Sequence, residues 1–159
     1  MRRLTLTGVI VLALAISQNP ANACSCDHTK RSAEELRAAY EAIFTADVVR
    51  IDLVEHCASM SDGRVGCYYE KDVTLRVWKS WKGVSTPFVI ARTGGGDADC
   101  GYDFKVGWSY VVFAHSGSET PIEVSACSPS VVESGQATLI GSLGEPLQTF
   151  SHQAGKERW

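Results

Sequence analysis

The cysteines of this chain are the residues with the most evident chemistry, and two of them follow a cleavage pattern. The segment Cys24-Ser25-Cys26 comes directly after an A-x-A pattern at residues 21–23. An apolar run over residues 4–16 lies upstream, behind two arginines. This combination is typical of a secretory signal peptide rather than of a membrane span. We therefore expect cleavage after Ala23, which would leave Cys24 with a free α-amine at the new N-terminus.

All six cysteines lie after the expected cleavage point, at positions 24, 26, 57, 67, 100 and 127. An even number of cysteines in an exported domain predicts three disulfides. Six cysteines allow about 15 pairings, so their spacing does not fix the connectivity. Metal binding through the C-x-C segment is the alternative. It is less favoured, because C-x-C metal carriers work in reducing compartments and the chain has no C-x-x-C.

A long hairpin is predicted in the first half of the chain. Apolar residues alternate with charged ones around Ile51, and a second alternating run surrounds Leu75. The Asp62-Gly63 turn signal lies between Cys57 and Cys67. A disulfide between these two cysteines would close the hairpin, and it is the most local pairing available.

The size and charge of the chain exclude several classes of protein. Removing residues 1–23 from the 159-residue chain leaves 136 residues, which suits one domain over residues 24–144 and a polar C-terminal tail over residues 145–159. The remaining net charge of −5 argues against binding of nucleic acid, which depends on Lys and Arg. No second apolar stretch approaches about 20 residues, so no membrane span is expected.

The remaining elements predict a mainly β fold. Ser32 and Glu35 form a capping box, and the apolar stripe that continues to Phe44 predicts a helix. Further strands are expected at residues 88–91, 109–114 and 122–126, and a second helix at residues 136–143. Five strands with two flanking helices suggest a small, closed or partly open barrel. The five-stranded Greek-key OB-fold is the natural candidate.

Catalytic motifs are absent from the sequence. It contains no H-E-x-x-H, G-x-S-x-G or phosphate-binding glycine loop, and its four histidines show no ligand spacing. His115, at the end of a predicted strand, is interpreted as a surface or barrel-rim residue. Six bridged cysteines would leave no nucleophilic thiol. We therefore expect a protein that is not an enzyme and that carries no cofactor of its own.

An ordered set of short motifs gives the chain a family resemblance. The set comprises C-S-C after the cleavage site, Trp81-Lys82-Gly83, Cys100-Gly101, the strand from Tyr110 to Ala114, and Ala126-Cys127-Ser128. In this order it resembles the N-terminal, netrin-like domain of the tissue inhibitors of metalloproteinases, in a single-domain form of bacterial type. The resemblance spans residues 24–144 and implies an OB-type barrel. It also implies the pairs Cys24–Cys100 and Cys26–Cys127, leaving Cys57–Cys67.

The resemblance further implies inhibition of a zinc metalloendopeptidase. The α-amine and carbonyl oxygen of Cys24 would chelate the catalytic zinc of the partner protease, which keeps one coordination position open. The implied contact surface is Cys24, Ser25, Cys26, Asp27 and His28, together with Asp97, Ala98 and Asp99. The chain departs from the family in having no cysteine between residues 27 and 56 and no cysteine-rich C-terminal subdomain. These departures bear on the range of targets.

Two other interpretations remain open. A netrin-like domain can be a protein-binding module without a protease target, because fold does not settle function. A lipoprotein is the other alternative, since lipid attachment occurs at a cysteine after small residues. Acylation would consume both the thiol and the amine of Cys24. Ala21 fits the lipoprotein pattern poorly, because a bulky apolar residue is usual three positions before the lipid-modified cysteine. The preferred expectation is a monomer that is secreted or periplasmic.

Overall fold

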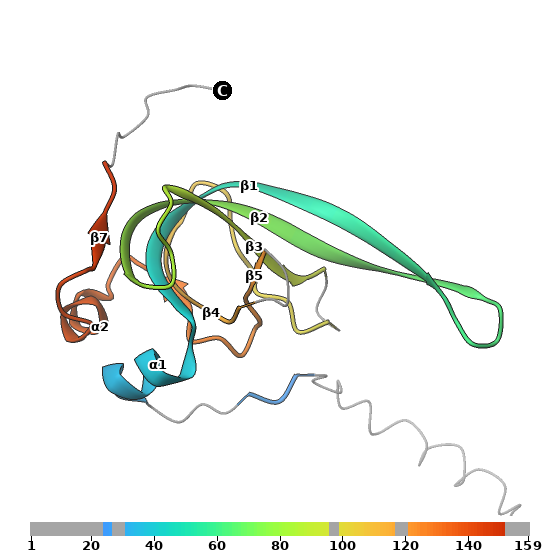
Figure 1. The fold of residues 1–159 in the computed structure, drawn as a ribbon, viewed down its shortest axis with the longest axis horizontal. Coiled ribbons are helices and arrows are strands. Elements are labelled where there is room, and N and C mark those ends of the chain that lie inside the picture. The colour runs from blue at the N-terminus through green and yellow to red at the C-terminus, as the bar shows by residue number, and fades with distance from the viewer. Residues whose placement is uncertain (1–23, 27–30, 96–98, 117–120, 152–159) are drawn as a thin grey trace, which may run out of the picture.

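The computed structural model describes residues 24–26, 31–95, 99–116 and 121–151. These residues form one mainly antiparallel sheet with two short helices beside it (Figure 1). The strand order is β5-β3-β2-β1-β4-β6, and β7 pairs with β2. In chain order the elements are α1 (Ala33–Ala39), β1 (Ala42–Ser59), β2 (Val65–Lys82), β3 (Phe88–Gly94), β4 (Ser109–Ala114), β5 (Ile122–Glu123), β6 (Val131–Val132), α2 (Ala137–Ser142) and β7 (Gln148–Thr149).

The hairpin of β1 and β2 is the largest feature of the fold, and it confirms the hairpin predicted from the sequence. Each strand has 18 residues, and their pairing runs from Ile43 opposite Lys82 to Ser59 opposite Val65. The pairing is irregular at three places, all between Ile43 and Arg50. Irregularities of this kind bend a strand. The proximal half forms the centre of the sheet, and the distal half projects from the body on the side away from α2 (Figure 1).

Helix α1 begins where the sequence predicts but ends earlier. The capping box is present: Ser32 Oγ accepts from the Glu35 N–H, and Glu35 accepts from the Ser32 N–H at 2.6 Å. The Lys82 ammonium then donates to the carbonyls of Arg37 and Tyr40, both at 2.6 Å, which favours a helix end. The expectation that the helix continues to residue 44 is wrong.

The apolar run that suggested a longer helix belongs instead to a strand buried on both faces. Ile43 and Phe44 are both fully buried, but they pack in two different clusters. Adjacent strand residues point to opposite faces of a sheet, so each side chain enters a separate core. A strand buried on both faces lacks polar alternation, and its sequence therefore looks like the stripe of a helix.

The two cores lie on opposite faces of the sheet. The larger one includes Phe44, Leu75, Phe104, Tyr110 and Val112. The smaller one lies between the sheet and the helices and includes Leu36, Tyr40, Trp81, Phe113 and Leu143. Trp81 donates its indole N–H to the Gly144 carbonyl at 2.7 Å. This bond fixes the end of α2 to β2, and α2 matches the second helix predicted from the sequence.

The sheet has seven strands, so the expectation of five is wrong. The two additional strands, β6 and β7, have two residues each and carry no detectable alternation. Residues 148–149, expected to be tail, pair with β2, and β5 covers only the first part of the predicted strand at 122–126. Over the described part of the chain, β5 and β6 do not pair, so the sheet is not closed. A single bridge between His115 and Glu123 joins the end of β4 to β5.

Candidate functional site

The structure contains three disulfides, and they are the pairs that the sequence analysis expected. Cys24 is bonded to Cys100 and Cys26 to Cys127, with Cα–Cα distances of 5.6 and 5.0 Å. Cys57 is bonded to Cys67 across the hairpin. Six bridged cysteines leave no free thiol. Three disulfides indicate an oxidising, extracytoplasmic environment.

The two cysteines that anchor the N-terminal segment lie on neighbouring stretches of backbone. The Ala126 N–H donates to the Cys100 carbonyl at 2.7 Å, and Gly101 forms a bridge with Ser125. Cys100 has a φ of 53°, in the left-handed region that few side chains adopt. Cys100 and Cys127 are thereby held together, although they lie 27 positions apart in the chain.

A glycine makes this close arrangement possible. A Cβ added at Gly101 would lie 2.1 Å from the Gly94 carbonyl oxygen, so only glycine fits against the end of β3. The loop after β3 therefore returns directly onto the strand it leaves. Cys100, the anchor for Cys24, is positioned by this return.

The anchored segment presents Ser25 to solvent. Ser25 is exposed, whereas Cys24 and Cys26 on either side are half-buried. Asp99, which precedes the Cys24 anchor, is also exposed. Cys24, Ser25, Cys26 and Asp99 are thus brought to one part of the surface. The remaining predicted contact residues, Asp27, His28, Asp97 and Ala98, lie outside the described residues.

Two shallow hollows adjoin the anchored segment. One has a volume of about 270 Å³ and is lined by Ser25, Arg31, Tyr40 and the Cys26–Cys127 bridge among others. The other, of about 300 Å³, includes Glu70, Arg92, Asp99, Cys100 and Glu123 in its wall. Both hollows share His115 and Ser125. A partner docking over Ser25 would therefore meet a neutral-to-basic wall in one hollow and a mainly acidic wall in the other.

His115 is the residue of this surface that sequence reasoning undervalued. It is exposed at the rim, as expected, but it also joins the two hollows. Its Nδ1 lies 3.0 Å from Glu41 Oε2, and its ring lies against Tyr40 with centroids 4.7 Å apart. The hydrogen bond with His115 is the main cause of a lowered pKa at the Glu41 carboxyl. A backbone bridge with Glu123 joins His115 to the wall of the acidic hollow, and no sequence pattern signals that bridge.

Arg92 supplies the positive charge of the acidic hollow, and it is already engaged. Its guanidinium donates two hydrogen bonds to Asp72, at 2.8 and 3.1 Å, and lies 3.6 Å from Glu70. The hydrogen bonds to Asp72 are the main reason that the pKa of Arg92 is raised. Among the described residues, the acidic groups in the wall of this hollow are Glu70, Asp99 and Glu123, and the single charge of Arg92 is shared between Glu70 and Asp72.

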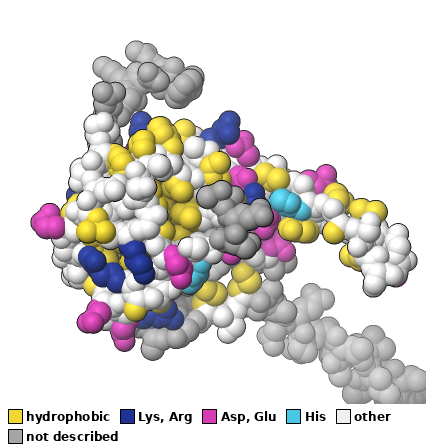
Figure 2. Space-filling model, viewed as in Figure 1, with side chains coloured by type: hydrophobic (Ala, Val, Ile, Leu, Met, Phe, Trp, Pro, Cys, Tyr) yellow, Lys and Arg dark blue, Asp and Glu magenta, His cyan; other side chains and the backbone are white. Residues whose placement is uncertain are grey.

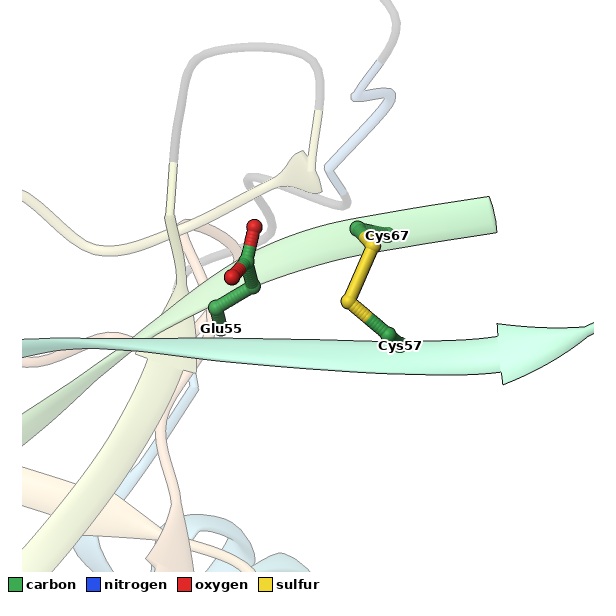
Figure 3. A group of neighbouring side chains, drawn as sticks. All are labelled: Glu55, Cys57 and Cys67. Carbon is green, nitrogen blue, oxygen red and sulfur yellow. A yellow bond between two sulfur atoms is a disulfide. The ribbon is translucent and has the colours of Figure 1, made fainter. Parts of the chain in front are cut away.

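One group of side chains has the composition of a metal site but does not have the free ligands. Glu55, Cys57 and Cys67 place a carboxylate oxygen and two sulfur atoms within 4.8 Å of one another (Figure 3). Both sulfurs are used in the disulfide, and thiolates are the form that binds metal. The described residues offer no other group of this kind. The part of the chain described here also contains no helix with the length and hydropathy needed to cross a membrane.

Comparison with models of known protein families gives no match for this chain. Comparison with curated proteins likewise gives none.

Proposed function

We propose that this chain is an exported inhibitor of zinc metalloendopeptidases, acting through the N-terminus that cleavage after Ala23 would create. The α-amine and carbonyl oxygen of Cys24 would form a five-membered chelate with the catalytic zinc of the protease and displace its bound water. An unperturbed α-amine has a pKa of about 8, so the neutral form that binds zinc is accessible at neutral pH. The inhibitor itself would carry no metal.

The observation that carries this proposal is the double anchoring of the N-terminal segment. Cys24 and Cys26 are each linked by a disulfide to a cysteine, and the two stretches that carry these cysteines are joined by the hydrogen bond from Ala126 to Cys100. A segment ordered before binding loses little conformational entropy when it binds, which increases affinity. Ser25 is exposed between the anchors, where its hydroxyl could enter a pocket beside the zinc. The sheet also supports an OB-type barrel as the scaffold, because the His115–Glu123 bridge links β4 to β5.

The experiment compares two forms of the exported protein. The mass of the native product is measured first, to identify a chain that begins at Cys24 and has three bridges. A form with one alanine added before Cys24 is then made, with an alanine added after Trp159 as the matched control. The natural form and the control should inhibit a zinc endopeptidase, and the N-terminally extended form should lose inhibition while keeping its thermal unfolding temperature.

Other results would reject the proposal in distinct ways. Equal inhibition by the N-terminally extended form would exclude chelation by the Cys24 amine. A lipid-modified Cys24 would have no free amine, and the chain would then be an anchored binding module. Absence of inhibition across a panel of zinc endopeptidases, with Cys24 free, would overturn the inhibitor assignment and favour a binding module.

A further inference from the structure

The distal part of the hairpin, residues 55–69 (the arm), is a two-stranded ribbon without a core. β4 pairs with β1 only from Ala42 to Asp47, and β3 pairs with β2 only from Glu70 to Arg76. Within the described chain the arm's one further backbone link is at its base, where the Gly95 N–H donates to the Tyr69 carbonyl at 3.0 Å. No residue of the arm is buried. Figure 2 shows the arm as a slender projection from the body.

The non-covalent contacts along the arm are weak. A ribbon of two strands is at best marginally stable in water. The polar contacts of the arm lie at exposed or half-exposed positions, including the Tyr69 hydroxyl on Glu55, at 2.5 Å, and Arg64 on Asp62, at 2.7 Å. Such contacts contribute little to stability in water. The order of the arm therefore depends heavily on its one covalent cross-link.

That cross-link is the Cys57–Cys67 disulfide, and it lies at a non-hydrogen-bonded pair of the antiparallel ladder. The Met60 N–H donates to the Arg64 carbonyl at 2.7 Å, so Met60 and Arg64 form a hydrogen-bonded pair. In an antiparallel ladder every second pair counted from this one is also hydrogen-bonded, and the pairs between are not. Cys57 and Cys67 oppose each other in an intervening pair without such bonds, with a Cα–Cα distance of 4.1 Å. Opening the disulfide would leave this level of the ribbon without any direct link.

The same disulfide is the most accessible of the three. It is the one bridge in which both cysteines are exposed: in Cys26–Cys127 only Cys127 is exposed, and in Cys24–Cys100 both cysteines are half-buried. Attack on a disulfide needs a thiolate to reach one of the sulfur atoms, so access governs its rate. The other two bridges join segments 76 and 101 positions apart and pin the N-terminal segment, whereas Cys57–Cys67 spans only 10.

We propose that Cys57–Cys67 is a reversible redox site: a dithiol protein reduces this bridge and releases the arm, while Cys24–Cys100 and Cys26–Cys127 stay closed. One thiolate of the dithiol attacks a sulfur of the bridge, the S–S bond breaks, and the second cysteine leaves as a thiolate that solvent protonates. The second thiol of the dithiol resolves the mixed disulfide. Two electrons pass to the bridge, and the dithiol becomes a disulfide.

Glu55 would moderate this reaction. Its carboxylate lies beside both sulfur atoms on the same face of the ribbon (Figure 3). A negative charge at this distance repels an incoming thiolate. Coulomb's law in water corresponds to an effect of about fourfold on the rate, and salt screens it. The reaction should therefore be sensitive to the charge at position 55.

The test uses dithiothreitol as the dithiol, on the native folded protein with a metal chelator present. Samples taken over time are alkylated, and the labelled cysteines are identified by mass spectrometry. Cys57 and Cys67 should be labelled together, about tenfold faster than the other four cysteines. Earlier or simultaneous labelling of Cys24, Cys26, Cys100 or Cys127 would overturn the proposal.

Two variants and one further measurement separate the parts of the proposal. Glu55→Gln should be reduced about fourfold faster at low salt, with the difference shrinking at high salt, whereas Glu34→Gln on α1 should change nothing. Equal rates for both variants would remove Glu55 from the mechanism. Hydrogen exchange should lose its protection over residues 55–69 in the reduced protein and in Cys57→Ser/Cys67→Ser. Unchanged protection in both would show that the bridge does not control the arm.

Discussion

The Ala126 N–H donates to the Cys100 carbonyl at 2.7 Å, and this one bond joins the two places to which the N-terminal segment is tied. Cys100 holds Cys24, and Cys127, next to Ala126, holds Cys26. The position of Ser25 is therefore set by two covalent links and one short stretch of sheet-like backbone. Any change that separates these two stretches should disturb the anchored segment.

The first prediction concerns Ser25. Ser25→Gly should weaken inhibition of a sensitive zinc endopeptidase by about tenfold, equivalent to about 1.4 kcal/mol of binding free energy, because the pocket would lose its occupant. The side chain is exposed, so the free energy of unfolding should change by less than about 0.5 kcal/mol. Inhibition and denaturant curves measure both quantities. Ser134→Gly is the control, and equal potency of both variants would remove Ser25 from the interface.

The second prediction ranks the disulfides by the loops they close. In the chain-entropy description, the loop closed by Cys57–Cys67, with a separation of 10, contributes roughly 3 kcal/mol. The bridges with separations of 76 and 101 contribute roughly 4.5 kcal/mol each. Cys57→Ser/Cys67→Ser should therefore lower the free energy of unfolding less than Cys26→Ser/Cys127→Ser does. Urea denaturation of both variants checks this order, and a reversed order would refute it.

The third prediction concerns two buried serines beside the Cys127 anchor. Ser130 Oγ accepts from the Phe113 N–H at 2.9 Å, and Ser128 Oγ donates to the Phe113 carbonyl at 2.5 Å. Ser130→Ala would leave a buried N–H without its partner, so it should cost about 1–3 kcal/mol of unfolding free energy. Ser142→Ala removes an exposed hydroxyl on α2 and should cost less than about 0.5 kcal/mol. Comparable losses in both variants would contradict the assignment.

The fourth prediction is a pH dependence at the rim. The pKa of Glu41 is lowered from 4.5, mainly by its hydrogen bond with His115. A carboxyl with a depressed pKa in the folded state stabilises the fold above its unfolded pKa and loses that contribution as pH falls. The stability difference between the natural chain and Glu41→Gln should therefore be greatest above about pH 5 and shrink in more acidic solution. Urea denaturation across this range measures it, and a difference independent of pH would exclude the contact.

Local signals made much of this fold predictable. The capping box at Ser32 fixed the start of α1, and the Asp62-Gly63 turn between alternating runs fixed the hairpin. The strand at residues 109–114 agrees residue for residue with β4. In each of these cases neighbouring residues in the chain carry the full physical reason for the element, so no knowledge of the tertiary structure was needed.

Elements that depend on distant partners were not predictable. The sequence pattern around Ile43 and Phe44 predicts a helix because both faces of β1 are buried there, partly against segments far along the chain. β6 and β7, with two residues each, exist only because β4 and β2 offer them edges. The candidate site divides in the same way. The anchored cysteines follow from an ordered set of motifs, whereas His115 and Ser125 reach the site through pairings that leave no local pattern.

The continuity of β1 and β2 also has a mechanical consequence. The same two strands form the wall of the body and the arm, so a load that separates them at the turn would break their cross-strand bonds one after another, from the turn inward. Such peeling requires little force at each step. The Cys57–Cys67 disulfide would halt this separation of the strands after the turn and the first few pairs. The load would then pass directly into the centre of the sheet.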